Sequence, residues 1–315
     1  MIIPLYATSV NQVATRLMEL RAHAGMAAQA RHLTLLVECT TSDMENSIQT
    51  ARAATMGHPG RVVVVTTEAP GPSPALDAQI RVGSDAGSGE IIVLRLVGPA
   101  ADHLDAVVTP LLVPDAPVVV WWPSRRPEVP VASALGAMAT RRITDARGAN
   151  DPVKALHQLT TGYTPGDTDL CWSRLTPWRT MLVAALQDAP APGAVTSAAI
   201  SGPRGVAADL MAAWLGSTLR VPVRREVGPH GALSAVELNF SGGSRLLLDK
   251  EHTQAGAVLR CSGRPDQHLV LSRRSTPDCL AEELLQLGPD LAYGELVTKA
   301  LPVYCALEGH DANPQ

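Results

Sequence analysis

The runs Leu33-Thr34-Leu35-Leu36-Val37 and Arg61-Val62-Val63-Val64-Val65 decide the fold of the first half of this 315-residue chain. Both are short, apolar and rich in branched side chains, as is typical of strands buried on both faces of a sheet. Between them, Ser42-x-x-Glu45 has the same helix capping-box pattern as Ser9-x-x-Gln12 near the start of the chain, and apolar residues follow it at helical spacing. This order predicts a parallel pair of strands joined by a crossover helix.

The pattern changes farther along the first half. Gln79 to Val82 alternates between apolar and polar residues, and Ile91 to Val97 is apolar. The small-residue loop Gly83 to Gly89 joins them, so we predict a hairpin and therefore a mixed sheet. The loop matches neither phosphate-binding glycine motif and leads into a strand instead of a helix, so we do not interpret it as a phosphate site. Ala116 to Trp122 is a further buried strand.

The second half combines helices with a run of strands. After a predicted strand at Val195 to Ile200 and a helix at Ala207 to Leu219, four apolar runs follow without helices between them, which predicts an antiparallel meander. These runs are Leu233 to Phe240, Arg245 to Leu248, Ala257 to Cys261 and His268 to Leu271. The length favours two domains. We predict an α/β protein, with an N-terminal mixed-sheet α/β domain carrying helices on both faces (residues 1–162) and an α+β domain with an antiparallel meander (residues 163–315).

The segment Tyr163 to Arg179 opens the second domain, and we call it the connector. Pro165-Gly166 predicts a tight turn, because proline presets the second turn position and glycine accepts a positive φ at the third. Asp167, Asp169 and Thr176 are interpreted as structural capping residues, since their side-chain oxygens can accept backbone N–H groups.

Tryptophan and arginine are dense in the connector. These residue types often dominate binding surfaces. A connector between domains also needs tryptophans to fill the seam and arginines to satisfy carbonyl groups, and on residue type alone this second interpretation is favoured.

Charge and cysteine content restrict the class of protein. A formal net charge of -4 gives no basic footprint for nucleic acid. No apolar run approaches the roughly 20 residues of a membrane helix. The five cysteines are far apart and form no CxxC pair or metal-ligand spacing. We predict a soluble, reduced, cytoplasmic protein that binds no membrane.

The sequence contains no clear catalytic set. There is no G-x-S-x-G elbow and no H-E-x-x-H motif. Asp167 and Asp169 are close enough in sequence to hold a metal, but short-range capping explains them more simply. Arg141 and Arg142 with Asp145 can form a buried pair or a phosphate clamp, although a solvated strand is the commoner arrangement. We therefore assign no catalytic residue, no metal ligand and no cofactor.

Six stretches, in this order along the chain, together resemble the glucose-6-phosphate dehydrogenase assembly protein family, often called OpcA, in its actinobacterial form. They are His58 to Val63, Asp77 to Val82, Leu111 to Val118 leading into Trp121-Trp122, Arg141 to Asp145, Tyr163 to Arg179, and Cys279 to Leu284. The most specific is the connector, Pro-Gly-Asp-Thr-Asp-Leu-x-Trp-x-Arg-Leu-Thr-Pro-Trp-Arg, with the double tryptophan upstream. The resemblance implies a non-catalytic protein effector that binds glucose-6-phosphate dehydrogenase and promotes its assembly and activity in the oxidative pentose phosphate pathway.

Two hypotheses of different kinds follow. In the first, the chain is a regulatory partner whose contact residues are chosen by type and motif position: Trp121, Trp122, Arg141, Arg142, Trp172, Arg174, Trp178 and Arg179. In the alternative, it is an enzyme or sensor for a sugar phosphate or nucleotide. The residues lining that cleft would be Arg141, Arg142, Asp145, Asp167 and Asp169.

Overall fold

The computed structural model describes residues 1–23, 32–57, 60–67, 75–86, 89–188, 193–203, 205–227, 232–250 and 255–307. The chain divides into two compact units, neither of which is one continuous piece. Unit 1 comprises Met1–Asp145, Thr164–Thr168 and Thr276–Asp290, and unit 2 comprises Ala146–Tyr163, Asp169–Ser275 and Leu291–Gln315. The sequence-based division at 162/163 lies beside one of the passages between the units. It differs from the observed division because residues 146–162 belong to unit 2, whereas residues 164–168 and 276–290 return to unit 1.

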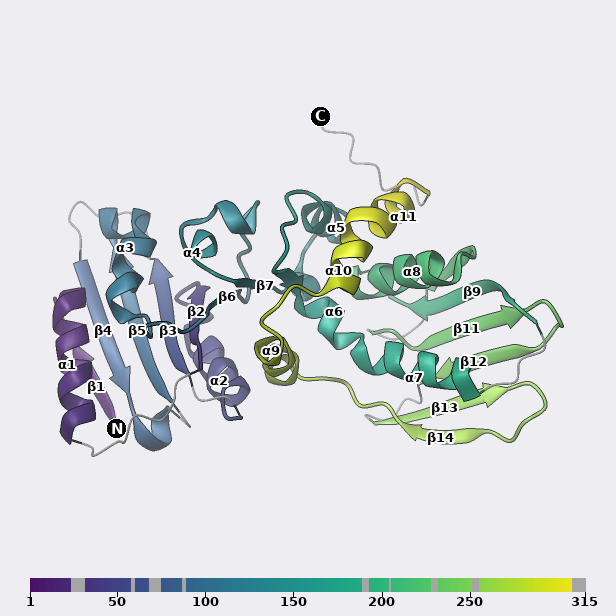
Figure 1. Cartoon of the computed structure of the whole chain (residues 1–315), viewed down its shortest axis with the longest axis horizontal. Coiled ribbons are helices and arrows are strands. Elements are labelled where there is room, and N and C mark those ends of the chain that lie inside the picture. Colours follow the sequence, from purple (N-terminus) through teal and green to yellow (C-terminus); the bar gives the residue numbers. More distant parts are fainter. Residues whose placement is uncertain are drawn as a thin grey trace. The chain divides into compact units, whose positions relative to one another are not determined.

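Unit 1 is built on an eight-stranded sheet in the order β1-β4-β5-β3-β2-β6-β7-β8 (Figure 1). The strands are β1 (Ile2–Leu5), β2 (Thr34–Cys39), β3 (Arg61–Thr67), β4 (Ala75–Arg81), β5 (Glu90–Val97), β6 (Val118–Trp122), β7 (Arg141–Thr144) and β8 (Asp167–Asp169). The pairs β2–β3, β3–β5, β2–β6 and β6–β7 are parallel, whereas β4 is antiparallel to both β5 and β1. The predicted crossover and the predicted hairpin are thus confirmed, and the sheet is mixed.

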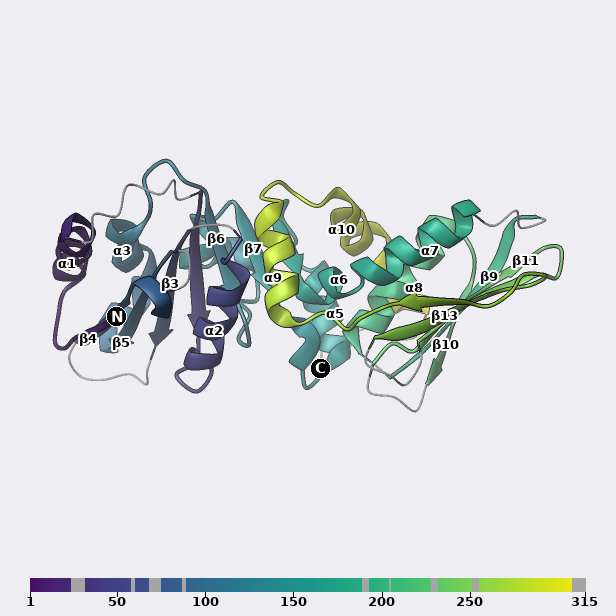
Figure 2. The same ribbon diagram turned by 90° about the horizontal axis from the view of Figure 1, so that it is seen from below.

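Helices cover both faces of this sheet. They are α1 (Val10–His23), α2 (Met44–Ala54), α3 (Leu104–Val108), α4 (Ala134–Ala137) and α9 (Thr276–Leu285), with 3-10 turns between them. Helices α1, α3 and α4 share one apolar cluster with alternate strand residues such as Leu36 and Val63. Leu35 and Val62 point to the opposite face, because side chains alternate along a strand, and there α2 packs beside α9 (Figure 2).

The two predicted capping boxes have different outcomes. Before α1, Ser9 N–H donates to Gln12 Oε1 at 2.9 Å and Gln12 N–H donates to Ser9 Oγ at 3.3 Å, so that box is confirmed. The box predicted at Ser42 is wrong. Asp43 is the N-cap of α2 without a side-chain cap, and the Glu45 carboxylate instead pairs with Arg81 at 2.9 Å. His58, Pro59 and loop residues 68–74 and 87–88 lie outside the described residues.

Unit 2 is built on a six-stranded sheet in the order β10-β9-β11-β12-β13-β14. The strands are β9 (Val195–Gly202), β10 (Val223–Val227), β11 (Ala235–Phe240), β12 (Arg245–Asp249), β13 (Gly256–Cys261) and β14 (Gln267–Val270). From β9 through β11 to β14 every pairing is antiparallel, which confirms the predicted meander. The added edge strand β10 runs parallel to β9, so this sheet is also mixed.

The helices of unit 2 share one apolar core with its sheet. They are α5 (Pro152–Thr160), α6 (Leu170–Arg174), α7 (Thr176–Asp188), α8 (Val206–Leu219), α10 (Leu291–Glu295) and α11 (Leu301–Leu307), with a π-helical turn at Leu296–Ala300. Leu210, Leu238 and Leu301 are fully buried in this core. Across the part of the chain that the structure describes, no helix combines the length and the apolar character needed to cross a membrane.

Candidate functional site

The connector begins with a closed turn. The Asp167 N–H donates to the Thr164 carbonyl at 2.9 Å, and the Thr164 N–H donates to Asp167 Oδ2 at 2.8 Å. Gly166 has a φ of +101°, which L side chains rarely adopt. The turn predicted at Pro165-Gly166 is therefore confirmed, and Asp167 holds it closed from its far end.

Arg142 fastens this turn to β7. Its Nε pairs with the Asp167 carboxylate, and its two Nη atoms donate to the carbonyls of Ala139 at 2.7 Å and Pro165 at 2.8 Å. Its own N–H donates to the Gly166 carbonyl at 2.9 Å. Both charged groups are buried, so the pair is stable only because these hydrogen bonds compensate the loss of water.

Arg141 forms a second buried pair on β7. Its Nη2 contacts the Glu283 carboxylate of α9, and its Nη1 donates to the Gly288 carbonyl at 2.7 Å. The Arg141 side chain is 1% exposed and that of Glu283 is 5% exposed. The solvated strand that sequence statistics favoured at Arg141 to Asp145 is thus wrong for β7, where Arg141 to Thr144 are all buried. The pairing partner lies 142 residues away in the sequence.

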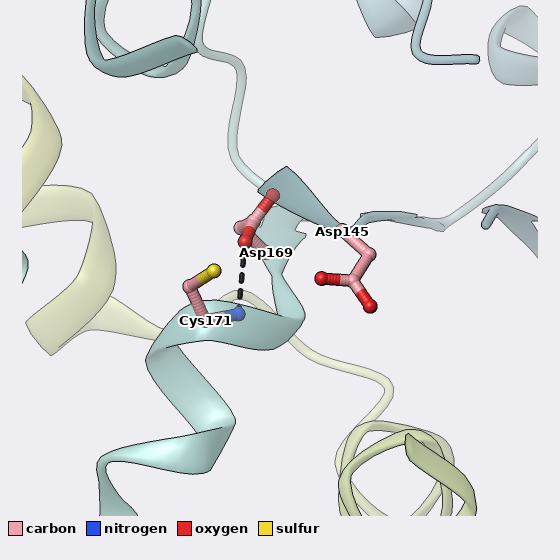
Figure 3. A group of neighbouring side chains, drawn as sticks. All are labelled: Asp145, Asp169 and Cys171. Carbon is pink, nitrogen blue, oxygen red and sulfur yellow. Dashed lines mark hydrogen bonds between the residues drawn. The ribbon is translucent and has the colours of Figure 1, made fainter. Parts of the chain in front are cut away.

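Asp169 is the N-cap of α6, and Figure 3 shows its carboxylate facing the start of that helix. Oδ1 accepts the Cys171 N–H at 2.8 Å, and Oδ2 accepts the Ala146 N–H at 3.0 Å. Backbone N–H groups thus solvate this fully buried carboxylate. Thr176 is the first residue of α7, and its Oγ1 accepts a hydrogen bond from Arg179 at 3.0 Å.

The tryptophans of the connector belong to the core of unit 2. Trp172 is 1% exposed and lies against Tyr293, with ring centroids 6.1 Å apart. The Arg179 guanidinium carbon stands 3.4 Å from the centre of the Trp172 ring, in position for a cation–π interaction. Trp178, 7% exposed, is part of the same core.

The remaining two predicted tryptophans belong to unit 1. Trp121 and Trp122 are 2% and 1% exposed, and the Trp122 Nε1–H donates to the Glu38 carboxylate at 2.7 Å. Side chains this deeply buried offer almost no contact area to another protein. Of the eight predicted contact residues, only Arg174 and Arg179 are partly exposed, and the other six are buried. The choice by residue type mainly selected residues of the core and of buried ion pairs, because tryptophan and arginine occur there as well as on binding surfaces.

One polar cluster was missed by the sequence analysis. The sheet contains the strand order β5-β3-β2-β6-β7. From β2 the chain goes on to β3 and β5 on one side of β2, and then crosses back to form β6 and β7 on the other side. Strands β2 and β6 therefore flank a topological switch point. Glu38 lies in β2, and Asp43 follows that strand. Hydrogen bonds from Ser124 and Thr40 hold the pKa of Asp43 below its usual range. A signal was present in the sequence, namely polar residues directly after two buried strands.

Both halves of the chain are similar to known proteins. Residues 51–161 match the model for the N-terminal domain of a glucose-6-phosphate dehydrogenase subunit, and residues 165–297 match the model for the C-terminal domain of the same protein, both of the OpcA family. A protein of Synechocystis sp. described as an OxPP cycle protein, OpcA, is 26% identical over an alignment of 266 residues that covers 68% of this chain and 55% of that relative. The chain therefore spans about half the length of this relative.

Two solved structures are similar to this chain at a coarse level. An NAD binding oxidoreductase from Klebsiella pneumoniae is 10% identical with a TM-score of 0.44, covering 89% of this chain and 97% of that one. An oxidoreductase from Sinorhizobium meliloti is 9% identical with a TM-score of 0.44, covering 89% of this chain and 98% of that one. Likeness at this level carries no argument about activity.

Proposed function

This chain belongs to the glucose-6-phosphate dehydrogenase assembly protein family, OpcA, and on that premise we propose that it is a non-catalytic protein effector of glucose-6-phosphate dehydrogenase. In this proposal it binds the dehydrogenase in the cytoplasm and promotes its assembly and activity. The observation that carries the proposal is that both halves match the family's two domains in order, over residues 51–161 and 165–297.

An effector of this kind acts through differential binding. It shifts its target toward one state only if it binds that state better than another. Couplings of this type are typically about 1–3 kcal/mol, or roughly 5- to 150-fold in affinity. A protein surface with no reacting groups is sufficient for that task.

The alternative of a sugar-phosphate or nucleotide enzyme is less well supported. An anion would have to displace Glu283 from Arg141 or Asp167 from Arg142, both buried pairs. Asp169 is already occupied by backbone N–H groups. At the switch point of the first sheet, where α/β proteins commonly bind ligands, the carboxylate of Asp43 would repel a phosphate at the start of α2.

The direct test uses the cognate dehydrogenase purified alone and mixed with this chain. We expect the two proteins to elute together in size-exclusion chromatography. We also expect the dehydrogenase rate at subsaturating glucose 6-phosphate to rise on addition of the chain. Separate elution with unchanged kinetics would refute the proposal. Calorimetry of the chain alone with glucose 6-phosphate, 6-phosphogluconate and NADP tests the alternative. The alternative requires that at least one of these three ligands gives a heat of binding.

A further inference from the structure

Unit 2 contains an apolar groove whose lining includes none of the site residues predicted from the sequence. It has a volume of about 730 Å³ and lies between the second half of α8, the start of β10 and the face of the helix that runs from α10 through the π turn to α11. Its floor includes Ala213, Gly216, Leu296 and Ala300, and Val303 stands on its wall. We call it the α8/α11 groove.

The outer wall of the groove leaves apolar surface exposed. Val303 and Leu307, four residues apart on α11, are 60% and 81% exposed. Side chains at this spacing lie on one face of a helix and form a continuous apolar strip.

The helix that forms this wall has an unusual centre. Pro302 has no N–H and cannot donate to the carbonyl four residues earlier, that of Thr298. The π turn Leu296–Ala300 ends two residues before this proline and interrupts the regular helix. Single π turns inside helices are frequently found at functional sites. Here the turn provides Leu296 and Ala300 to the floor of the groove.

Another residue of the groove lining, at the end of α8, has a backbone conformation that is unfavourable for its residue type. Arg220 ends α8 with φ 56° and ψ 45°, a left-handed conformation in which glycine is the usual residue. A non-glycine side chain there costs about 1 kcal/mol, and such strain is often retained at binding sites. Arg220 is one of the residues that line the groove.

The three structural elements around the groove are held together beneath it. Asp209 of α8 accepts hydrogen bonds from Arg225 of β10 at 2.9 Å and from Tyr304 of α11 at 3.0 Å. Asp209 is 6% exposed, so these bonds are shielded from water. The groove is therefore a fixed feature of unit 2 and does not need to be formed by a ligand.

The shape of the groove suits the side chains of a helix. Its lining on the α10–α11 side extends from Ala292 to Leu307, which at 1.5 Å per residue is roughly 20 Å, or about four helical turns. An apolar groove between two helices is the geometry in which an amphipathic helix binds through residues spaced by three and four.

The charged residues that line the groove indicate which sign of charge a bound helix would carry. Arg220 and Lys299 line the groove with one acidic residue, Glu295, which pairs with Lys299 at 3.2 Å. Both members of that pair are more than 70% exposed, so it is weak and readily exchanged. In a symmetric contact with a second copy, each groove would meet the same excess of positive charge, which disfavours self-association.

We propose that the α8/α11 groove binds an amphipathic helix of the dehydrogenase, with apolar side chains against Val303 and Leu307 and a carboxylate near Arg220 and Lys299. This inference rests on the proposed function and names the surface through which unit 2 would act.

The test measures the affinity of the full chain for the purified dehydrogenase. Val303→Asp and Leu307→Asp place charge in the apolar strip at exposed positions, and each is expected to weaken binding by about tenfold or more. Val270→Asp on β14 is the matched control, because Val270 is 75% exposed and lies outside the groove; it should bind within twofold of the unchanged chain. Lys299→Glu should also weaken binding. Leu307→Ser repeats the test without added charge, and circular dichroism verifies folding of every variant.

The outcomes separate the two proposals. If the unchanged chain does not bind the dehydrogenase, the proposed function fails and the groove inference fails with it. If the unchanged chain binds but the groove variants bind equally well, only the groove inference is overturned. A photocrosslinker at position 303 that captures an acidic helical segment of the dehydrogenase supports the inference, whereas capture of a second copy of this chain overturns it.

Discussion

Replacing Arg142 by methionine tests whether the connector is held by its buried ion pair. Arg142→Met keeps most of the side-chain length and removes the guanidinium. Asp167 then retains the Thr164 N–H at 2.8 Å but loses its cation. The carbonyls of Ala139 and Pro165 lose their donors as well.

The expected cost follows from the burial of the pair. The side chains of Arg142 and Asp167 are 5% and 10% exposed, so the remaining carboxylate is left in a medium with little water. Removing one partner of a buried pair costs about 3–5 kcal/mol. Arg142→Met with Asp167→Asn removes both charges, and we expect its cost to be smaller than the sum of the single variants by about 1–3 kcal/mol.

Native-state hydrogen exchange is the suitable assay, because a chain of two units need not unfold in one transition. The amide of residue 142, which donates to the Gly166 carbonyl at 2.9 Å, reports directly on opening of the turn. Arg224→Met is the matched control. The Arg224 side chain is 77% exposed, so a change within about 0.5 kcal/mol is expected.

Two results would refute this reasoning. One is a loss of less than about 1 kcal/mol in Arg142→Met, which is the value of an exposed pair. The other is strict additivity in the double variant, which would mean that the two charges do not interact.

Three further predictions concern single residues. A Cβ at Gly166 would lie 2.5 Å from the Thr140 carbonyl oxygen at a φ of +101°, so Gly166→Ala should cost about 2 kcal/mol or more by native-state hydrogen exchange at the amide of residue 142. The hydrogen bond from Ser124 lowers the pKa of Asp43, so the stabilisation that it gives is present above the ordinary carboxyl pKa and is lost as the pH falls through the lowered pKa. Asp43→Asn should therefore destabilise the chain at pH 7, and this difference should shrink as the pH falls below the ordinary carboxyl pKa. Burial raises the pKa of Cys39 to about 11, so mass spectrometry should find its alkylation by iodoacetamide at pH 8 far slower than that of free cysteine.

Local patterns in the sequence were sufficient for much of the fold. Branched apolar runs predicted β2 and β3, four spaced runs predicted the meander, and Pro165-Gly166 predicted the turn. These features depend on side-chain period and on the allowed φ of single residues, both of which are properties of a short segment. The edge strand β10 was missed, since its half-exposed residues Val223 to Val227 lack a buried stretch.

Burial and pairing were decided only by the tertiary structure. Arg142 meets Asp167 across 25 residues, and Arg141 meets Glu283 across 142, which no local pattern encodes. The sequence marked the tryptophans of the connector as notable, but an indole that fills a core and one that binds a partner have the same local signature. The α8/α11 groove likewise exists only where distant helices meet. The connector is therefore a sequence-determined turn and cap, whose tryptophans the tertiary structure assigns to the core, because burial depends on what the rest of the chain packs against them.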